Sequence, residues 1–151
     1  MDKIREFFKK DRFAAHNDIT LLEIRPGYAK AQMIISDKHL NGVDITHGGA
    51  IFTLADLAFA VASNSHGTVA VGVSATISYL KATSEGILTA EAREAALNPK
   101  LATYQVEVRD EDRDLVAVFQ GTVYRKKQAL ALSLIHISEP TRLLSISYAV
   151  F

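Results

Sequence analysis

The sequence predicts a single α+β domain in which an antiparallel sheet of five or six strands wraps round one long buried helix. Three observations lead to this prediction. One segment is apolar on every side over the length of a helix, and the segments after it alternate apolar and charged residues as antiparallel strands do. Strands and helices do not alternate along the chain, which disfavours a parallel sheet of βαβ units. With 151 residues the chain is long enough to bury a real hydrophobic core in one domain.

The N-terminal part of the chain predicts a short helix followed by a hairpin. Residues 2–10 place apolar side chains at helical spacing among Lys, Arg and Glu, as in a short amphipathic helix. Residues 19–35 have a strand pattern that is interrupted at Pro26 and Gly27, a turn-forming pair, so we expect a β-hairpin. The polar stretch 36–47 predicts a loop.

The central helix is predicted over residues 47–64. This segment is rich in Ala and Leu, has no Gly or Pro after its start and would form about four turns. Because it is apolar almost all the way round, we expect it to be buried on every side. Four strands are predicted after it, at 68–81, 86–96, 101–110 and 115–126.

The last 24 residues, 128–151, do not continue the strand pattern. The stretch 134–151 resembles translated sequencing-adapter sequence that is found appended to unrelated gene models. We therefore predict a domain over residues 1–127 and a non-native tail over 128–151, to which we assign no function.

Composition excludes several classes of protein. The absence of cysteine excludes disulfides, thiolate metal clusters and a cysteine nucleophile. The 17 basic residues balance 17 acidic ones, whereas nucleic-acid binders usually carry a basic excess, so we expect no nucleic-acid partner. The first residues are charged and no apolar run approaches the roughly 18 residues of a membrane-spanning helix, so we expect a cytoplasmic protein without a membrane partner. We expect no metal site either, because His16, His39 and His66 show no ligand spacing and are predicted to be surface or loop residues.

Asp56 lies in the middle of the predicted apolar helix, where a charged carboxylate without a partner is energetically costly. Its neighbours on the same helix face, Phe52, Thr53, Phe59 and Ala60, cannot neutralise it. The carboxylate is therefore either paired from elsewhere in the fold or directed into a cavity where it has a function. Burial would also raise its pKa, which suits a group that takes a proton from water.

The residues His47, Gly48 and Gly49 stand where the helix is predicted to begin. Unpaired backbone N–H groups and the positive end of the helix dipole lie at such a position, so an oxyanion can be held there without a charged side chain. Glycine also lets a ligand carbonyl approach the backbone closely. An ordinary helix entry explains the same residues, because glycines begin many helices.

The spacing of Gly48 and Asp56 places a requirement on any site that uses both. The two residues are eight positions apart, or about 12 Å along one helix. Reacting groups must lie within about 3–3.5 Å of each other. If both residues act on one reacting carbon atom, each site must take one of them from a second chain, which predicts at least a dimer with two helices side by side.

These residues belong to a longer pattern that resembles the hotdog-fold thioesterases of the phenylacetate-degradation family. The pattern reads Asn41-x5-His47-Gly48-Gly49-x6-Asp56-x2-Phe59-x4-Asn64, with further matches in the strands at 73–81 and 121–125. The resemblance covers roughly residues 10–127. It implies a hotdog fold that hydrolyses acyl-coenzyme A (acyl-CoA) thioesters to free acid and CoA, in phenylacetate catabolism. The acyl group would be aryl, such as phenylacetyl or its hydroxylated forms, or of medium length.

The resemblance also implies a role for each residue of the pattern. Asp56 would be the nucleophile or the general base that activates water, and the Gly48 amide of the opposite subunit would polarise the thioester carbonyl. Asn41 and His47 would position that carbonyl or the water, and Ser74 would assist the water on the Asp56 side. No metal or cofactor would be needed, since CoA is part of the substrate, and relatives suggest a tetramer of two dimers.

Further substrate contacts are predicted at Gly49, Phe52, Phe59, Tyr79, Lys81 and Arg125. Phe52 and Phe59 favour an aryl pocket, although core packing explains them equally. Lys81 and Arg125 suit the phosphates of CoA, although solvated strand ends explain most such residues. Many relatives have Arg-Pro where this chain has Lys81-Ala82, which leaves the nucleotide contacts open.

Two other functions fit parts of the sequence. A non-catalytic acyl-CoA sensor would have the same pocket but no need for Asp56, Asn41 and Ser74 together. An acyl-thioester hydratase or dehydratase would use an Asp/His pair before the helix, which Asp44 and His47 imitate loosely, but Asp56 would then be unexplained.

Overall fold

The computed structural model describes residues 1–130, and within them it shows three α-helices, one short 3-10 helix and six strands. The helices are α1 (Asp2–Phe8), α2 (Arg12–His16), the 3-10 helix η1 (Asp37–His39) and α3 (Gly48–Asn64). The strands are β1 (Ile19–Arg25), β2 (Tyr28–Ile34), β3 (Thr68–Tyr79), β4 (Ile87–Leu97), β5 (Leu101–Arg109) and β6 (Leu115–Ala129).

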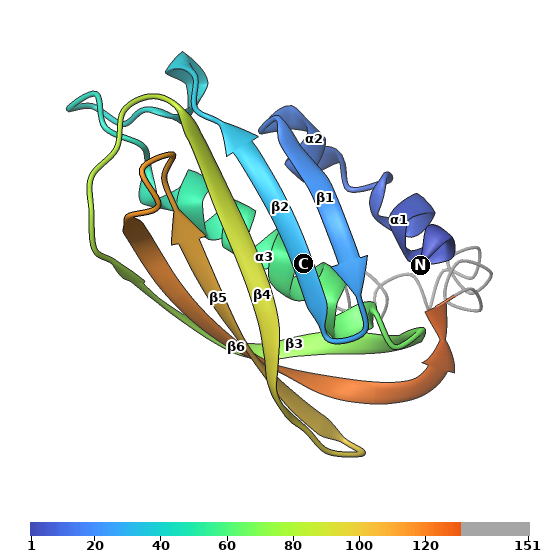
Figure 1. Ribbon diagram of the computed structural model, residues 1–151. Helices are drawn as coiled ribbons and strands as arrows, with labels where there is room; N and C mark the ends of the chain where they lie inside the picture. The colour runs from blue at the N-terminus through green and yellow to red at the C-terminus, as the bar shows by residue number, and fades with distance from the viewer. Residues whose placement is uncertain (131–151) are drawn as a thin grey trace.

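All six strands form one antiparallel sheet in the order β1-β2-β4-β5-β6-β3. The sheet curves round α3, which runs along its concave side (Figure 1). The predicted α+β architecture, a curved antiparallel sheet round a long helix, is therefore confirmed as a hotdog fold. The predicted hairpin is β1 and β2, and its turn has Gly27 at φ +73°, a conformation that glycine adopts without strain.

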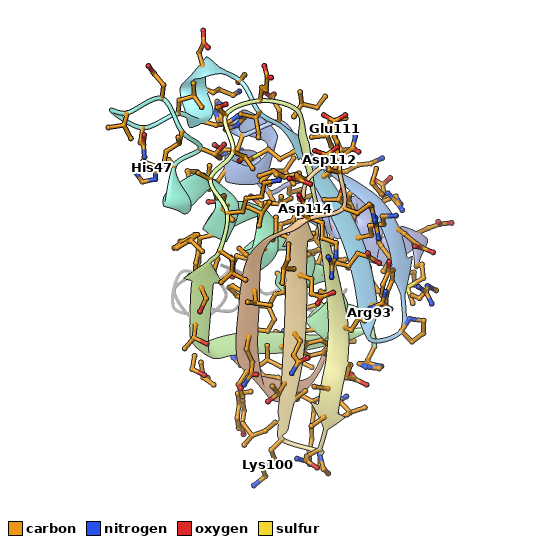
Figure 2. All side chains as sticks on the ribbon, turned by 60° about the vertical axis from the view of Figure 1, so that its left-hand side comes forward. His47, Arg93, Lys100, Glu111, Asp112 and Asp114 are labelled. Carbon is orange, nitrogen blue, oxygen red and sulfur yellow. The ribbon has the colours of Figure 1, made fainter. Side chains whose placement is uncertain are left out.

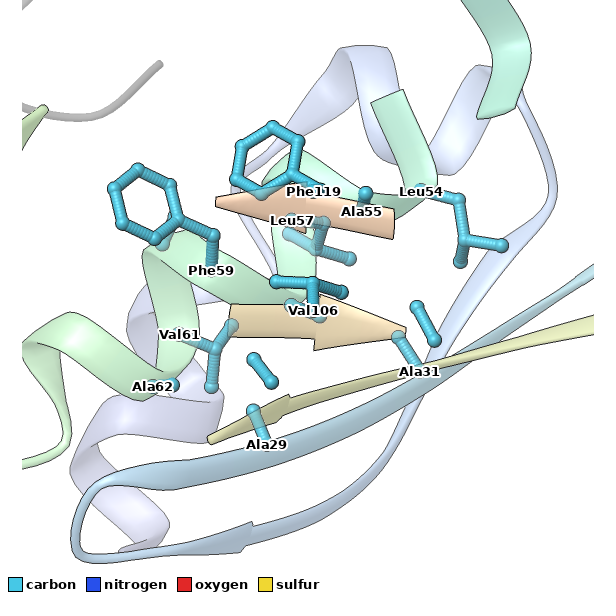
Figure 3. Close-up of a cluster of buried hydrophobic side chains, with 14 of the residues drawn as sticks. Ala29, Ala31, Leu54, Ala55, Leu57, Phe59, Val61, Ala62, Val106 and Phe119 are labelled. Carbon is cyan, nitrogen blue, oxygen red and sulfur yellow. The ribbon is translucent and has the colours of Figure 1, made fainter. Parts of the chain in front are cut away.

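Helix α3 fills the concave side of the sheet because its side chains are apolar and many of them are small. Leu54, Ala55, Ala58 and Val61 have no exposed surface, and they pack with β2 alanines such as Ala29 and Ala31 (Figure 3). The alanines bring helix and sheet close together, so even one inserted methylene disturbs the packing. The prediction that this helix is buried on every side holds for its second half but not for one face of its first half, where Gly49, Phe52, Thr53 and Asp56 are partly or fully exposed.

The N-terminal residues form two helices, of which only the first is predicted from the sequence. Helix α1 buries Ile4 and Phe8, and the Arg5 guanidinium donates a hydrogen bond of 3.0 Å to the Leu21 carbonyl on β1. Helix α2 begins at Asp11, whose carboxylate accepts a hydrogen bond of 2.9 Å from the Ala14 N–H. A helix of five residues is too short to show a periodic pattern, so α2 was not predicted.

Strand β6 extends past the predicted domain boundary at residue 127. It ends at Ala129, and Leu130 is buried in the hydrophobic core. The predicted non-native tail lies outside the described residues from 131 onward. In the described part of the chain, no helix has the length and apolar character needed to cross a membrane.

Candidate active site

The start of α3 presents one free backbone donor. His47 is the N-cap, and its Nδ1 accepts a hydrogen bond of 2.8 Å from the Gly49 N–H. The His47 carbonyl accepts the N–H groups of Ala50 and Ile51. The Gly48 N–H has no acceptor among the described residues. Of the two glycine amides, Gly48 is therefore the one that is available to a ligand, at the positive end of the helix dipole.

Tyr79, at the end of β3, explains why residue 48 is a glycine. The Tyr79 hydroxyl donates a hydrogen bond of 3.0 Å to the Gly48 carbonyl. A Cβ atom at residue 48 would lie 3.0 Å from the Tyr79 Cζ atom, closer than ordinary van der Waals contact. Tyr79 therefore holds the first turn of α3 in position, a role that the sequence pattern does not show.

Asn41 organises the loop before α3. Its Oδ1 accepts hydrogen bonds from the N–H groups of Val43, at 3.0 Å, and Ile45, at 3.3 Å. The Asn41 Nδ2 has no hydrogen-bond acceptor in the part of the chain that the structure describes. The side chain thus shapes the loop with its oxygen while its amide nitrogen can still donate to a ligand.

The Asp56 carboxylate is largely buried and has no hydrogen bond or ion pair with any residue from 1 to 130. Burial, together with the smaller effect of the negative charge of Asp11, raises the pKa of this carboxyl from its ordinary value of 3.8 to about 7. Of the two explanations that the sequence left open, pairing from elsewhere in the fold is not found among residues 1–130 of the protomer. A poorly solvated carboxylate that ionises near neutral pH is instead suited to proton transfer or nucleophilic attack.

One protomer does not bring Asp56 and Gly48 together. Both lie on the continuous helix α3, eight residues and about 12 Å apart. A site that uses both residues would therefore have to take one of them from a second protomer.

Ser74 also lies away from Asp56 within one protomer. It is exposed on β3, an edge strand, and is in register with Thr122 on β6. Gly121, the neighbour of Thr122 on β6, faces α3. Successive residues of a strand point to opposite faces, so Thr122 and its partner Ser74 face the other way. Ser74 therefore points away from α3, and its assignment as an aid to the water stays a prediction.

The two phenylalanines differ in their surroundings. Phe59 is 1% exposed and packs on Gly121, where an added Cβ atom would lie 2.6 Å from the ring. The structure places Phe59 in the core rather than on a substrate pocket, which corrects the predicted contact. Phe52 is partly exposed and makes an edge-to-face contact with Phe119, with ring centroids 5.4 Å apart.

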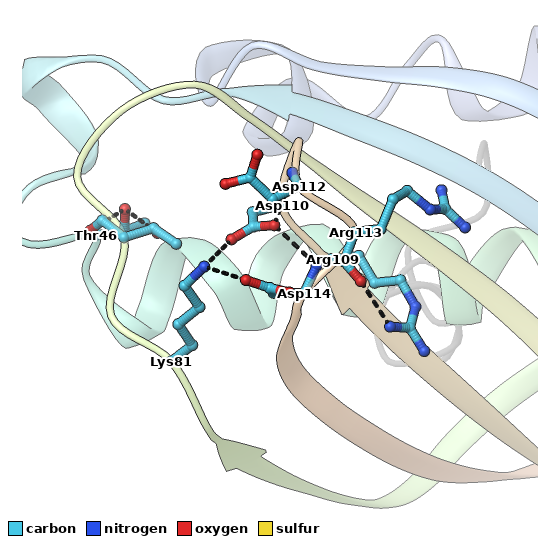
Figure 4. Close-up of polar contacts among 8 residues, drawn as sticks. Thr46, Lys81, Arg109, Asp110, Asp112, Arg113 and Asp114 are labelled. Atoms are coloured by element: carbon cyan, nitrogen blue, oxygen red, sulfur yellow. Dashed lines mark hydrogen bonds and ion pairs between the residues drawn. The ribbon is translucent and has the colours of Figure 1, made fainter.

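Lys81 does not present a free charge to phosphate. Its ammonium group pairs with Asp110 at 2.5 Å and with Asp114 at 2.8 Å (Figure 4). Hydrogen bonds to these two carboxylates hold the pKa of Lys81 above its ordinary value. Glu111 and Asp112 line the same surface depression, so carboxylates outnumber the one cation and would repel phosphate. Within the described residues Lys81 forms an ion pair between two loops, and its contact with phosphate stays a prediction.

Arg125 lies at the other end of the molecule. Its guanidinium donates a hydrogen bond of 2.9 Å to the Asn98 carbonyl, and its backbone N–H donates to the Lys100 carbonyl. Figure 2 shows Lys100 and His47 at opposite ends of the protomer. Arg125 can therefore reach a substrate bound at Gly48 only if that substrate lies on another protomer.

His39 differs from its prediction as a surface or loop residue, whereas His66 lies partly exposed in the turn after α3, in agreement with the prediction. His39 is 1% exposed, accepts the Ser36 N–H at Nδ1 and donates from Nε2 to the Asn17 carbonyl. His66 contacts Glu94 at 2.7 Å, and the Tyr104 hydroxyl donates to the same Glu94 oxygen. Both are structural, because their polar atoms are used within the fold.

Asp11 is the site residue that sequence reasoning missed. An Asp before a short helical stretch is an N-cap signal, but its electrostatic effect on Asp56 depends on tertiary packing. Among residues 1–130, the carboxylates close enough to share a metal ion are Asp110, Asp112 and Asp114, and two of them hold the Lys81 ammonium.

The sequence of this chain is similar to known proteins. The model of the thioesterase superfamily matches residues 44–117. A relative from Archaeoglobus fulgidus, named provisionally as an esterase, is 45% identical over 83% of this chain and 82% of its own length. The acyl-coenzyme A thioesterase PaaI of Escherichia coli is 34% identical over 78% of this chain and 85% of its own length.

Solved structures show the same fold. The structure of the E. coli PaaI protein, from the phenylacetic acid degradation operon, superposes with a TM-score of 0.80 at 31% identity and covers 83% of this chain and 91% of its own. A Streptococcus mutans protein solved with bound acetyl CoA gives a TM-score of 0.70 at 26% identity, covering 74% of this chain and 90% of its own. The matched residues 44–117 include Gly48 and Asp56.

Proposed function

Because this chain belongs to the thioesterase superfamily, we propose that it hydrolyses acyl-CoA thioesters to free acid and CoA at sites shared between two protomers. The observation that carries this proposal is the Asp56 carboxylate, largely buried and without a polar partner among the described residues. The named activity of the E. coli relative and the acetyl CoA bound to the S. mutans neighbour support the substrate class.

Asp56 acts on the thioester carbon or on a water beside it. As a general base, it takes a proton from water while the water oxygen adds to the carbonyl carbon. The C–S bond then breaks, the thiolate of CoA leaves and the proton passes to sulfur. As a nucleophile, Asp56 forms a mixed anhydride with release of CoA, and water then cleaves the anhydride. A carboxyl with a pKa of about 7 is partly ionised at neutral pH, which permits either route.

The Gly48 N–H of a second protomer donates to the carbonyl oxygen as negative charge develops on it. The free donor and the aligned dipole of α3 support this role, and such donors act most strongly where water is excluded. The 12 Å spacing explains why a homodimer is the smallest active unit, and a tetramer of two dimers fits the same scheme.

The neighbouring residues position the substrate. His47 holds the first turn of α3 by accepting a hydrogen bond from the Gly49 N–H. This N–H is therefore not available to the substrate, and Gly49 contributes only by leaving room for it. Asn41 donates from Nδ2 to the carbonyl or the water, and Ser74 assists the water across the protomer interface. The acyl group is aryl, such as phenylacetyl, or of medium length. The partly exposed Phe52 ring, one turn before Asp56 on α3, is suited to contact the substrate near its thioester.

An acyl-CoA sensor has less support, because a buried unpaired carboxylate is costly in a site that performs no chemistry. A hydratase using Asp44 and His47 has less support as well. Asp44 is exposed in the turn shaped by Asn41, and the His47 Nδ1 is engaged as the helix cap.

The test is thiol release from phenylacetyl-CoA and from straight-chain acyl-CoA, with the full chain and its Asp56→Asn variant. We expect turnover that falls by at least about 10²-fold in the variant, the scale of one positioned acid–base group. The variant should fold at least as stably, because burial disfavours the charge that it removes.

Binding without turnover would favour the sensor, and hydration of crotonyl-CoA would favour the hydratase. Undiminished hydrolysis in Asp56→Asn would remove Asp56 from the mechanism.

A further inference from the structure

We propose that a cavity bordered by α1, α2, β1 and α3, and open to solvent on one side, receives the acyl group of the substrate. This inference rests on the proposed function and deepens it, because it names the part of the chain that selects the acyl group. The spaced motif of the sequence does not point to this cavity, since that motif begins at Asn41, after α1 and α2.

The cavity has a volume of about 300 Å³ and walls that are mostly apolar. Phe8 of α1, Ala14 and Ala15 of α2, Ile19 of β1 and Leu57 of α3 line it. An apolar cavity of roughly 150 Å³ can hold benzene. The space is therefore sufficient for a phenylacetyl group or a medium-length acyl chain.

The cavity lies beside the catalytic carboxylate. Leu57, in its wall, directly follows Asp56 on α3, and Asp11, also in its wall, is close enough to raise the pKa of Asp56. Asp56 and Leu57 lie about 100° apart round the helix, so both can face the N-terminal helices. An acyl group in the cavity would thus lead its thioester toward Asp56.

The charged residues of the cavity wall indicate an uncharged acyl group. The Arg5 guanidinium is bound to the Leu21 carbonyl, Lys9 pairs with Glu6 at 2.7 Å, and Asp11 caps α2. Both cations of this wall, Arg5 and Lys9, already donate to a partner in the fold, so an acyl chain that ends in a carboxylate would have to displace one of these contacts.

A larger cavity, of about 870 Å³, is less suited to this role. Phe7, Ser65, His66 and Leu130 are among its lining residues, at the far end of α3. Ser65 is nine residues from Asp56, or about 14 Å along the helix. A substrate there would place its thioester out of reach of the carboxylate.

Changes in the cavity's size test the proposal. Ala15→Phe places a large ring on a cavity residue that is exposed enough to accept it without disturbing the core. Ile19→Ala enlarges the same cavity. Phe13→Ala is the matched control, because Phe13 is on the same helix, is 65% exposed and does not line the cavity. Circular dichroism verifies that each variant is folded.

The measurement is kcat/KM for acyl-CoA of two to twelve carbons and for phenylacetyl-CoA. In Ala15→Phe we expect the ratio of short-chain to long-chain kcat/KM to rise about tenfold or more, mainly through KM, since one methylene in a pocket accounts for at least that factor. Ile19→Ala should shift the ratio toward long chains, and Phe13→Ala should leave it unchanged.

An unchanged ratio in both cavity variants would overturn the acyl site while leaving thioester hydrolysis intact. If the wild-type chain hydrolyses no thioester, the proposed function fails. In that case the Kd of each variant for the same acyl-CoA series, measured by calorimetry, tests whether the cavity binds the acyl group. A change in acyl-length preference in the two cavity variants but not in Phe13→Ala would support the proposal. The same change in all three variants, or no change in any of them, would overturn it.

Discussion

The ionisation of Asp56 depends on the residues that surround it. On the sequence it is a carboxylate among apolar neighbours, and the structure adds burial, the missing partner and the negative charge of Asp11. Each of these disfavours the ionised form, so the group remains partly protonated at neutral pH. The same surroundings make it a better proton acceptor once it is ionised.

The activity should depend on pH through Asp56. Only the ionised carboxylate can take a proton or attack, so kcat/KM should rise with pH and reach half its plateau near pH 7. Asp11→Asn removes the nearby negative charge, which lowers the pKa of Asp56 and moves this acid limb to lower pH. Asn caps helices as well as Asp does, so α2 should persist.

Asp2→Asn is the control for this profile, because it removes an N-terminal carboxylate that does not contribute to the pKa shift of Asp56. An acid limb that stays in place in Asp11→Asn but moves in Asp2→Asn would contradict the assignment.

At the scale of elements, the contact between α3 and β6 depends on one missing side chain. The Phe59 ring occupies the space that a Cβ atom at Gly121 would need, so helix and strand approach more closely there than any other residue allows. This close approach allows Phe59 to reach Tyr104 and Phe119, with ring centroids 6.0 and 5.4 Å away.

Gly121→Ala should therefore destabilise the fold by about 1–3 kcal/mol, the usual cost of overpacking. Urea unfolding followed by circular dichroism measures this change. Gly42→Ala is the matched control, because an added Cβ atom there meets nothing within 4 Å. Equal stability of the two variants would mean that Phe59 moves aside without cost.

At the scale of the whole molecule, sites that take one residue from each of two protomers predict that mixed dimers regain activity. Asp56→Asn removes the carboxylate, and Gly48→Pro removes the amide hydrogen. The backbone of a first helical position suits proline, and His47 already has the extended backbone, with ψ 136°, that precedes proline. The Cβ atom that proline adds would crowd the Tyr79 ring, which is the end of a half-exposed side chain and can turn aside. Each variant alone should be inactive.

Dimers mixed after refolding together should recover about a quarter of wild-type activity, because half of them are hybrids with one intact site of two. Co-refolding each variant with itself is the control. No recovery, with hybrids verified by mass spectrometry, would show that each site is built within one protomer.

Much of the fold follows from local pattern alone. The apolar run that became α3, the turn at Gly27 and the alternating strands are properties of short segments, so they could be predicted within a few residues. The five-residue helix α2 and the last residues of β6 were missed, because neither has enough length or contrast to form a pattern.

The candidate site, like the fold, could be predicted from the sequence only in part. The sequence by itself determined that Asp56 is out of place in an apolar helix, that glycines begin this helix and that their spacing exceeds the reach of one site. Only the tertiary structure decided that Phe59 belongs to the core, that Lys81 is held by two aspartates and that Tyr79 and Asp11 adjoin the site. These outcomes depend on contacts between residues far apart in the chain, and such contacts leave no periodic trace in the sequence.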